Sequence, residues 1–215
     1  MLFRSLLQGL GRRDPDEIEE TDNPVIIAGY GRFGQVVSRL LKASGYRTTL
    51  LDHDAGQIEL SGRFGNKVFY GDAANPELLR SAGAGKARLL VIALDDKEKV
   101  LDMIHIAQMH FPNLRVLVRA YDRTHAYELL RAGADYIVRE TFGSALTLGR
   151  EALVLLGNSE TRARRMTESF DEHDTEGMVK LSEVWGNEHE YGLRIRQNLE
   201  DLEAVLQADK DAPEE

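Results

Sequence analysis

The stretch Val25-Ile-Ile-Ala-Gly-Tyr-Gly-Arg-Phe-Gly34 decides the fold of this chain. Its apolar start predicts a buried strand, and its three glycines form a Gly-x-Gly-x-x-Gly loop that leads into a helix. In a dinucleotide-binding fold Gly29 makes the tight turn, Gly31 lets the backbone approach a phosphate, and Gly34 lets the helix pack on the sheet. The helix N-terminus offers N–H groups and a positive dipole end to an anion. We therefore predict a bound nucleotide.

An acidic segment follows the next predicted strand. Asp52, in Leu51-Asp-His-Asp54, stands at the strand end where an acid hydrogen-bonds ribose hydroxyls and repels a 2′-phosphate. That favours NAD(H), AMP or another adenosine nucleotide over NADP. His53 and Asp54 could contact the adenosine, although helix capping is the favoured interpretation for Asp54.

The third predicted strand ends in Tyr70-Gly71-Asp72-Ala73, at the same edge of the sheet as the expected nucleotide. The same residues also suit a turn in which Asp72 or Asn75 caps a helix that starts at Pro76. The predicted nucleotide-binding residues are Gly29, Gly31, Arg32, Phe33, Gly34, Asp52, His53, Asp54, Gly71, Asp72 and Ala73.

After Pro24 the sequence alternates strand and helix patterns with short breaks. The predicted strands are Val25–Ala28, Thr48–Asp52, Val68–Tyr70, Leu89–Leu94, Val116–Ala120 and Tyr136–Val138. The predicted helices are Gly34–Ser44, Ala55–Phe64, Pro76–Ala82, Lys97–Met109, Thr124–Ala132 and Ser144–Leu156. This order predicts an α/β fold, a Rossmann-like doubly wound parallel six-stranded sheet with helices on both faces.

The helix spacing predicts which faces are buried. In the first helix the apolar stripe expected to cover the sheet is Phe33, Val36, Val37, Leu40 and Leu41. Near the C-terminus a stripe of Ile195, Leu199, Leu202 and Leu206 could pack on a partner helix or on its own domain. We expect three regions: an N-terminal arm (1–23), a nucleotide-binding domain (24–157) and a helical dimerisation or regulatory extension (158–215).

Composition excludes several classes of function. A formal charge of −9 and a pI near 5.2 argue against a nucleic-acid partner, which requires a basic face. The absence of cysteine excludes disulfides and thiolate metal sites. The apolar, arginine-bearing start of the chain suits either a disordered arm or the cytoplasmic end of a membrane segment.

No constellation of catalytic residues stands out. The sequence has no Tyr-x-x-x-Lys, His-Glu-x-x-His or Gly-x-Ser-x-Gly pattern, and no metal site is expected. Too little chain follows the sheet for the substrate domain of a typical dehydrogenase. We therefore expect a nucleotide sensor and not an enzyme.

The segment Arg139-Glu-Thr-Phe142 joins the last predicted strand to a helix at Ser144. An arginine beside a helix N-terminus suits a carboxylate ligand, and a plain helix start explains the same residues.

Five segments of this chain occur together in one family: Gly29-Tyr-Gly-Arg-Phe-Gly-Gln35, Leu51-Asp-His-Asp54, Val68-Phe-Tyr-Gly-Asp-Ala73, Leu78-Leu-Arg-Ser-Ala-Gly83 and Arg139-Glu-Thr-Phe142. From about Pro24 to Asp174 the chain closely resembles the cytoplasmic KTN/RCK (TrkA-N type) regulatory domain of Kef glutathione-regulated potassium efflux systems.

The resemblance implies a regulatory role at the cytoplasmic face of a bacterial inner (plasma) membrane. It implies a homodimer formed by helices after the sheet, with AMP or NAD(H) in the Rossmann cleft. Glutathione near the dimer interface would hold a potassium:proton antiporter closed, and its S-conjugates would open it. The integral membrane antiporter domain would lie on the same polypeptide or on a separate subunit. A flavodoxin-like oxidoreductase subunit would be an ancillary activator.

Position in the family motifs also implies a glutathione site. Its residues would be Arg39, Arg139, Thr141, Phe142 and Asp174. Asp174 falls where the family can use an asparagine, and an acid there could accept a hydrogen bond from the ammonium group of the ligand.

Two alternatives to a Kef-type regulator stay open. One is an RCK or Trk-type potassium transport subunit gated by nucleotide alone, which would not need the Arg139-Glu-Thr-Phe142 segment. The other is a small NAD-dependent oxidoreductase, for which the sequence offers no placed acid or base.

Overall fold

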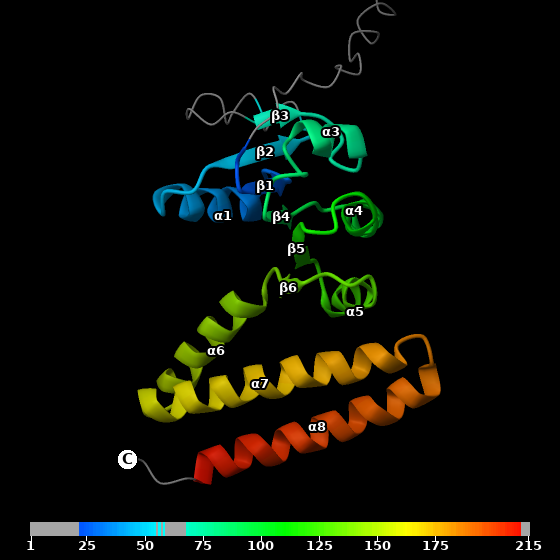
Figure 1. Cartoon of the computed structure of the whole chain (residues 1–215). Coiled ribbons are helices and arrows are strands. Elements are labelled where there is room, and N and C mark those ends of the chain that lie inside the picture. Colours follow the sequence, from blue (N-terminus) through cyan, green and yellow to red (C-terminus); the bar gives the residue numbers. More distant parts are fainter. Residues whose placement is uncertain (1–21, 55, 57, 59–67, 212–215) are drawn as a thin grey trace, which may run out of the picture. The chain divides into compact units, whose positions relative to one another are not determined.

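The computed structural model describes residues 22–54, 56, 58 and 68–211 (Figure 1). Six strands form one sheet in the order β3-β2-β1-β4-β5-β6, in which the chain starts near the middle and reverses direction after β3. The strands are β1 (Val25–Ala28), β2 (Thr48–Asp52), β3 (Val68–Tyr70), β4 (Leu89–Ile92), β5 (Arg115–Ala120) and β6 (Tyr136–Arg139). Helices connect them, so the predicted doubly wound α/β fold is confirmed.

The strand pairs are parallel and their central members are fully buried. β1 pairs with β2 and β4, so that Ile27 stands between Leu50 and Val91. Each of the four residues of β1 is buried, as expected for a central strand covered on both faces. This arrangement brings the carboxyl ends of β1, β2 and β4 to one edge of the sheet, where a doubly wound fold binds its ligand.

The chain divides into two compact units, Met1–Val116 and Leu117–Glu215. The boundaries predicted after residues 23 and 157 stay predictions. Within the first unit α1 (Arg32–Ala43) lies on one side of the strands, and α3 (Pro76–Ser81) and α4 (Lys97–His110) lie on the other (Figure 1). The helix predicted over Ala55–Phe64 lies largely outside the described residues.

Helices α3 and α4 each begin with a side chain that caps their first backbone N–H groups. The carboxylate of Asp96 accepts from the N–H groups of Glu98 and Lys99 at the start of α4. At the start of α3 the cap is Asn75, which accepts from Glu77 N at 2.9 Å and precedes a proline at the first helical position. The sequence predicted that either Asp72 or Asn75 caps this helix, and in the structure the N-cap is Asn75.

The stripe predicted to cover the sheet on α1 is only partly correct. Val36 and Leu40 are 63% and 67% exposed, whereas Gly34 and Ser38 are the buried residues of the helix. The small residues lie closest to the strands because they allow the helix backbone to approach. The two large aliphatic residues therefore remain on the outer face of the first unit.

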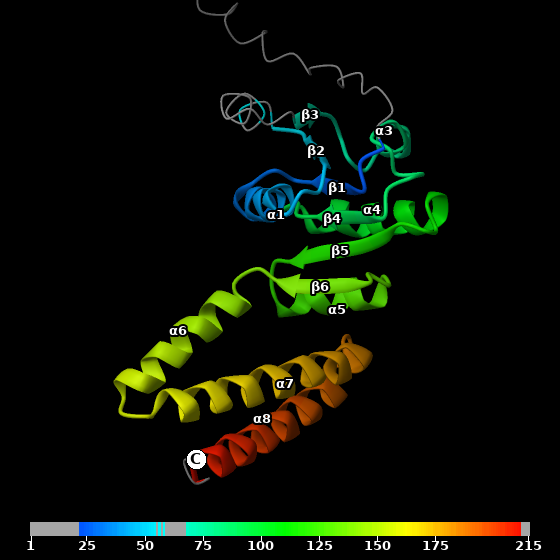
Figure 2. The ribbon, with the colours of Figure 1, turned by 60° about the vertical axis from the view of Figure 1, so that its left-hand side comes forward.

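In the second unit the helices are α5 (Arg123–Arg131), α6 (Phe142–Leu155), α7 (Glu160–Val184) and α8 (Glu188–Asp211). Figure 2 shows α7 and α8 side by side as an antiparallel hairpin, with α6 leading from β6 to the start of α7. The hairpin turns at Gly186, whose φ of 96° is a left-handed conformation that glycine adopts at low cost. The helices predicted after residue 157 are therefore present.

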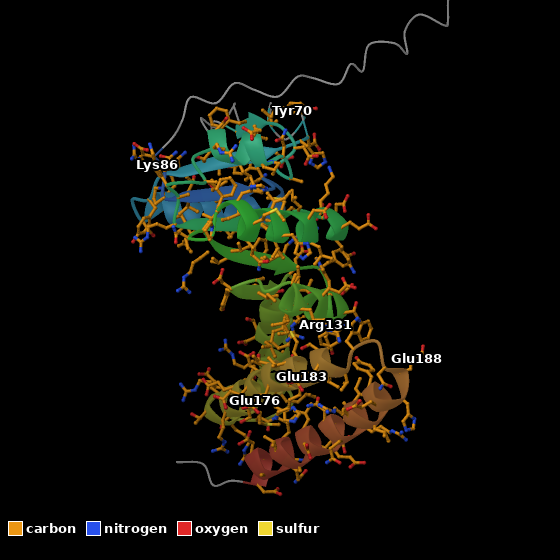
Figure 3. The ribbon with its side chains drawn as sticks, turned by 45° about the vertical axis from the view of Figure 1, so that its right-hand side comes forward. Tyr70, Lys86, Arg131, Glu176, Glu183 and Glu188 are labelled. Atoms are coloured by element: carbon orange, nitrogen blue, oxygen red, sulfur yellow. The ribbon has the colours of Figure 1, made fainter. Side chains whose placement is uncertain are left out.

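An aromatic cluster attaches the hairpin tip to α5. The ring of Tyr127 lies 5.3 Å from that of Trp185 and 6.2 Å from that of Tyr191, measured between centroids. Arg131 donates to the carbonyl oxygen of Trp185 at 2.7 Å, and Figure 3 shows Arg131 beside the end of α7 near Glu183. The tip of the hairpin is thereby anchored to the same helix that carries Tyr127.

The C-terminal apolar stripe packs mainly within its own unit. Ile195, Leu202 and Leu206 are half-buried on α8, whereas Leu199 is 53% exposed. Within the described ranges, none of the helices combines the length and the hydropathy needed to cross a membrane.

Candidate functional site

The glycine loop between β1 and α1 has the geometry that nucleotide binding needs. Gly29 has φ 95°, and a Cβ there would lie 2.6 Å from the carbonyl oxygen of Ala93. A Cβ on Gly34 would lie 2.0 Å from the carbonyl oxygen of Gly29, so the helix can start here only with glycine at that position. A Cβ on Gly31 would meet no described atom within 4 Å. Gly29 and Gly34 are therefore required by packing, whereas Gly31 faces open space.

The start of α1 is suited to an anion. Its N-cap is Gly31, which has no side chain to cap the first turn, and that turn contains no acidic residue. Helix N-terminal N–H groups and the helix dipole attract phosphate oxygens. Of the other two loop residues, Arg32 is exposed and Phe33 is half-buried, and their contact with a nucleotide stays a prediction.

Asp52 is buried at the carboxyl end of β2 and is held by two backbone donors. Its carboxylate oxygens accept from the N–H groups of Tyr30 at 2.6 Å and Asp54 at 2.8 Å. Each oxygen keeps a second lone pair that could accept from a ribose hydroxyl. His53 lies 3.9 Å from the same carboxylate and is 63% exposed. Asp54 accepts from Gly56 N at 2.8 Å, which agrees with the predicted capping role.

The third strand brings its polar end to the same edge. Gly71 N donates to the carbonyl oxygen of Asp52 at 3.0 Å, and a Cβ on Gly71 would lie 2.4 Å from Leu78. Asp72 accepts from Ala74 N at 3.2 Å. Its other oxygen lies 3.6 Å from Lys99 Nζ, and Ala73 is buried beside it. The structure therefore gathers the glycine loop, Asp52 and the Gly71-Asp72-Ala73 turn at one edge.

Tyr30 connects this edge to the first helix. Burial raises the pKa of its phenol, although a hydrogen bond to Ser38 and the positive charge of Arg39 act in the opposite direction. Arg39 itself is exposed on α1 in the first unit. Its part in a glutathione site with residues of the second unit stays a prediction.

Three of the predicted glutathione residues meet in the second unit. Arg139, at the end of β6, is ion-paired with Asp174 of α7. The guanidinium group of Arg139 also lies 3.5 Å from the ring centroid of Phe142. Thr141, the N-cap residue of α6, is exposed, and its carbonyl oxygen accepts from Ser144 Oγ at 2.9 Å. The site therefore combines a stacked arginine, an acid and the N-terminus of a helix.

The sequence prediction missed Arg123, which belongs to the same cluster. Arg123 is ion-paired with the second oxygen of Asp174, and its Nε donates to the hydroxyl of Tyr127 at 2.8 Å. Burial lowers the pKa of Arg123, but hydrogen bonds to Asp174 and Tyr127 outweigh burial, so that the pKa is raised. The sequence did contain a feature that could have identified Arg123. This residue follows the carboxyl end of β5, and doubly wound folds place functional residues at that edge of the sheet.

A buried ion pair supports the strand that carries Arg139. Arg119 on β5 donates to Glu140 at 3.0 Å, and its side chain is only 5% exposed. This pair aligns β6 against β5, where Val118 faces Ile137. The residue after Arg139 therefore has a structural role of its own.

Beside the cluster the second unit has an apolar groove of about 440 Å³ between α6, α7 and α8. Phe142 lines this groove and stacks on Phe170, which also lines it, with ring centroids 6.3 Å apart. The lining residues are Phe142, Ala145, Leu146, Gly149, Arg150, Leu153, Met166, Thr167, Phe170 and Leu206.

Two known protein families together match nearly the whole described chain. Residues 25–140 match the family described as TrkA-N domain, and residues 144–215 match that described as potassium efflux system KefB C-terminal domain. The chain is 44% identical over 170 residues to the glutathione-regulated potassium-efflux system protein KefC of Salmonella arizonae. That match covers 79% of this chain and 27% of the relative, so the chain spans about a quarter of that protein.

Solved structures give the same result. The structure described as Shewanella denitrificans Kef CTD in AMP bound form has a TM-score of 0.70 and 53% identity, and the match covers 75% of this chain and 99% of that one. The TrkA-N domain of inner membrane protein ybaL from Escherichia coli has a TM-score of 0.54, with 59% of this chain and 93% of that chain covered. At 21% identity, the second likeness supports the fold alone. The chain belongs to the TrkA-N domain family and, within it, to the C-terminal domains of Kef potassium-efflux systems.

Proposed function

We propose that this chain is the ligand-sensing regulatory domain of a potassium:proton antiporter. It binds a nucleotide in the Rossmann cleft and glutathione or its S-conjugates near a dimer interface, and so gates potassium efflux. The observation that carries the proposal is the 53% identity to a Kef C-terminal domain with AMP bound. It is a regulatory domain and not an enzyme, in keeping with relatives that are parts of potassium-efflux systems.

The nucleotide is AMP or NAD(H), held at the edge formed by the glycine loop and the ends of β2 and β3. The AMP-bound relative supports AMP, and the Gly-x-Gly-x-x-Gly loop accommodates either nucleotide. Asp52 would accept from the ribose hydroxyls, because two backbone N–H groups already fix the orientation of its carboxylate. The phosphate would lie over Gly31, where the protein leaves open space.

Glutathione is the regulatory ligand, and Arg39, Arg139, Thr141, Phe142 and Asp174 form its site. The name of the KefC relative, a glutathione-regulated system, supports this assignment. The ion-paired and stacked Arg139 supports it from the geometry, since a held guanidinium binds a carboxylate well. A bulky substituent on the glutathione sulfur would change the affinity for one dimer arrangement over another and shift the gating equilibrium.

The domain works as a homodimer that pairs through α6. Helix α6 is apolar, none of its residues is buried in the described chain, and Leu148 and Leu155 are 73% and 88% exposed. Such a face is stabilised when it is covered by a second copy. Sedimentation of the wild type and of Leu148→Glu tests this, with a dimer expected for the first and a monomer for the second.

The other partners follow from the same assignment. The integral membrane antiporter domain, on the same polypeptide or on a separate subunit, would place this domain at the cytoplasmic face of a bacterial inner membrane. A flavodoxin-like oxidoreductase subunit would be the ancillary activator. The share of the KefC relative that this chain leaves unmatched is large enough for a membrane domain.

The test is calorimetric titration of the AMP-loaded protein with glutathione, beside the Arg139→Ala variant. Saturable binding that the variant loses is the expected result. Failure of the intact, AMP-loaded dimer to bind glutathione would overturn the glutathione assignment and favour an RCK or Trk-type subunit gated by nucleotide. AMP binding is tested separately with Asp52→Asn, which should weaken it by roughly tenfold or more.

A further inference from the structure

Three aromatic rings fix the turn of the α7–α8 hairpin against α5. The ring of Trp185, at the end of α7, lies 5.3 Å from that of Tyr127 on α5 and 5.2 Å from that of Tyr191 on α8, measured between centroids. The two tyrosine rings lie 6.2 Å apart, so all three spacings are those of aromatic pairs in contact. The side chain of Tyr127 is fully buried, whereas Trp185 and Tyr191 are half-buried.

The hydroxyl of Tyr127 connects these rings to an ion-paired arginine. The Nε of Arg123 donates to this hydroxyl at 2.8 Å, and the hydroxyl of Tyr191 lies 3.5 Å from it. A phenol hydroxyl has one proton to donate and lone pairs that accept. Because the hydroxyl of Tyr127 already accepts from Arg123, it can donate its own proton to Tyr191. The two tyrosines are 64 residues apart in the chain, so this contact joins α5 to α8 directly.

Arg123 is also the arginine best placed to respond when Asp174 changes partners. Asp174 is ion-paired with both Arg123 and Arg139. Arg139 is 13% exposed and lies against the ring of Phe142, whereas Arg123 is 28% exposed. A ligand that bonds to the carboxylate of Asp174 replaces part of these contacts. The more exposed arginine then gives way first.

We propose that Tyr127 couples ligand binding at Asp174 to the start of α8. When a ligand bonds to Asp174, Arg123 shifts and withdraws its hydrogen bond from the buried hydroxyl of Tyr127. A buried hydroxyl without a donor is unfavourable, and the hydroxyl of Tyr191 can donate in its place. At 3.5 Å that hydroxyl is farther than the 2.7–2.8 Å typical of such bonds, so it has to move closer.

The rest of the hairpin tip allows this movement. Arg131 donates to the carbonyl oxygen of Trp185 at 2.7 Å, which holds the end of α7 to α5 without the help of Tyr127. Between the two helices stands Gly186, whose φ of 96° shows a backbone position that only glycine adopts at low cost. The end of α7 therefore stays in place while α8 turns about Gly186. This inference rests on the proposed glutathione binding and adds the element that responds to it.

The experiment uses Trp185, which is the only tryptophan of the chain. The AMP-loaded full chain is titrated with glutathione while the emission of Trp185 is recorded, and calorimetry on the same protein gives the Kd. A saturable change in emission with its midpoint at that Kd is expected, because both neighbouring rings move relative to the indole. Unchanged emission at a glutathione concentration that saturates the protein would overturn the coupling and leave the sensing role intact.

A matched pair of tyrosine variants tests the route. Tyr127→Phe keeps the buried ring and removes the hydroxyl, so it should lose most of the emission change at saturating glutathione. Tyr136→Phe removes the hydroxyl of a tyrosine on β6 that is 62% exposed, and it should keep the full change. Each protein is compared at its own saturation, so a difference in affinity does not affect the result. A full change in Tyr127→Phe would overturn the route through this hydroxyl.

The remaining outcomes separate the coupling from the proposed function. If the wild type binds no glutathione by calorimetry, the glutathione assignment falls and this inference with it. Urea unfolding establishes that each variant is folded at the titration temperature. If Tyr127→Phe is not folded, Tyr191→Phe replaces it, because this variant lacks the substitute donor and should also lose the emission change. A full change in Tyr191→Phe would likewise overturn the coupling.

Discussion

The guanidinium group of Arg139 lies 3.5 Å from the ring centroid of Phe142, three residues further along the chain. The ring stands at the start of α6, where Phe170 of α7 stacks on it. Arg139 is thereby held between an aromatic face and the carboxylate of Asp174. Arg139, which is proposed to bind a ligand carboxylate, is thus oriented by contacts within the protein.

Replacing Phe142 should weaken glutathione binding without removing a charge. Phe142→Leu deletes a cation–π contact of about 0.5–2 kcal/mol, which corresponds to a roughly two- to thirtyfold loss of affinity. Phe142→Tyr keeps the aromatic face and should bind nearly as the wild type does. Calorimetric titration measures both, and sedimentation checks that both variants keep the oligomeric state of the wild type. Equal affinity for glutathione in the leucine variant would show that the stacking does not contribute.

The two glycines of the loop should respond differently to alanine. Gly34→Ala places a methyl group against the carbonyl oxygen of Gly29, so it should destabilise the fold by about 2–3 kcal/mol. Gly31→Ala meets open space at a φ of −71°, and its unfolding free energy should change by less than about 0.5 kcal/mol. AMP binding to Gly31→Ala should nevertheless fall sharply, because the methyl group would occupy the space proposed for the phosphate.

Urea unfolding without nucleotide and titration with AMP separate these effects. A Gly31→Ala protein that binds AMP as well as the wild type does would mean that the phosphate lies elsewhere.

Removing Glu140 should destabilise the second unit. Glu140→Ala leaves the guanidinium of Arg119, which is 5% exposed, without its carboxylate partner at 3.0 Å. Breaking a buried pair in this way costs about 3 kcal/mol. Glu151→Ala is the matched control, because Glu151 is 61% exposed and its pair with Arg150 should contribute less than about 0.5 kcal/mol. Urea unfolding compares the two, and equal losses would contradict a structural role for Glu140.

Tyr191 should make the stability of the hairpin depend on alkaline pH. Burial, together with a hydrogen bond to Tyr127, raises the pKa of Tyr191 from 10.0 to about 12. Between these two values the unfolded chain releases a proton that the native state retains, so stability is full below about pH 10 and falls as pH rises to about 12. Tyr191→Phe should lack this part of the decline. Urea unfolding at about pH 9, 10 and 11 measures the difference, and identical pH slopes would exclude it.

The sequence predicted the sheet unit closely. The described strands and helices from β1 to α6 differ from the predicted ones by at most two residues at either end. These elements are recognisable because buried parallel strands are continuously apolar and the glycine loop has a fixed spacing. The same local reasoning correctly placed Asp52 at the carboxyl end of β2.

The helical spacing of apolar residues gave a partly wrong prediction of burial on α1, because burial depends on which element covers each face of the helix. Val36 and Leu40 fit the apolar stripe of a buried helix and are nevertheless exposed, because Gly34 and Ser38 form the face of α1 that lies closest to the strands. Helical periodicity shows that a helix has an apolar side, but it does not show which neighbour covers that side.

By itself the sequence determined the doubly wound sheet, the glycine loop and the position of Asp52, the acid proposed to bind ribose, because each is specified by residues near one another in the chain. Only the tertiary structure showed that Arg123 shares Asp174 with Arg139, since Arg123 and Asp174 are 51 residues apart. It likewise showed that Tyr127 holds Arg123 in place. Ion pairs between distant elements follow from how α5, β6 and α7 pack, and no local periodicity encodes that packing.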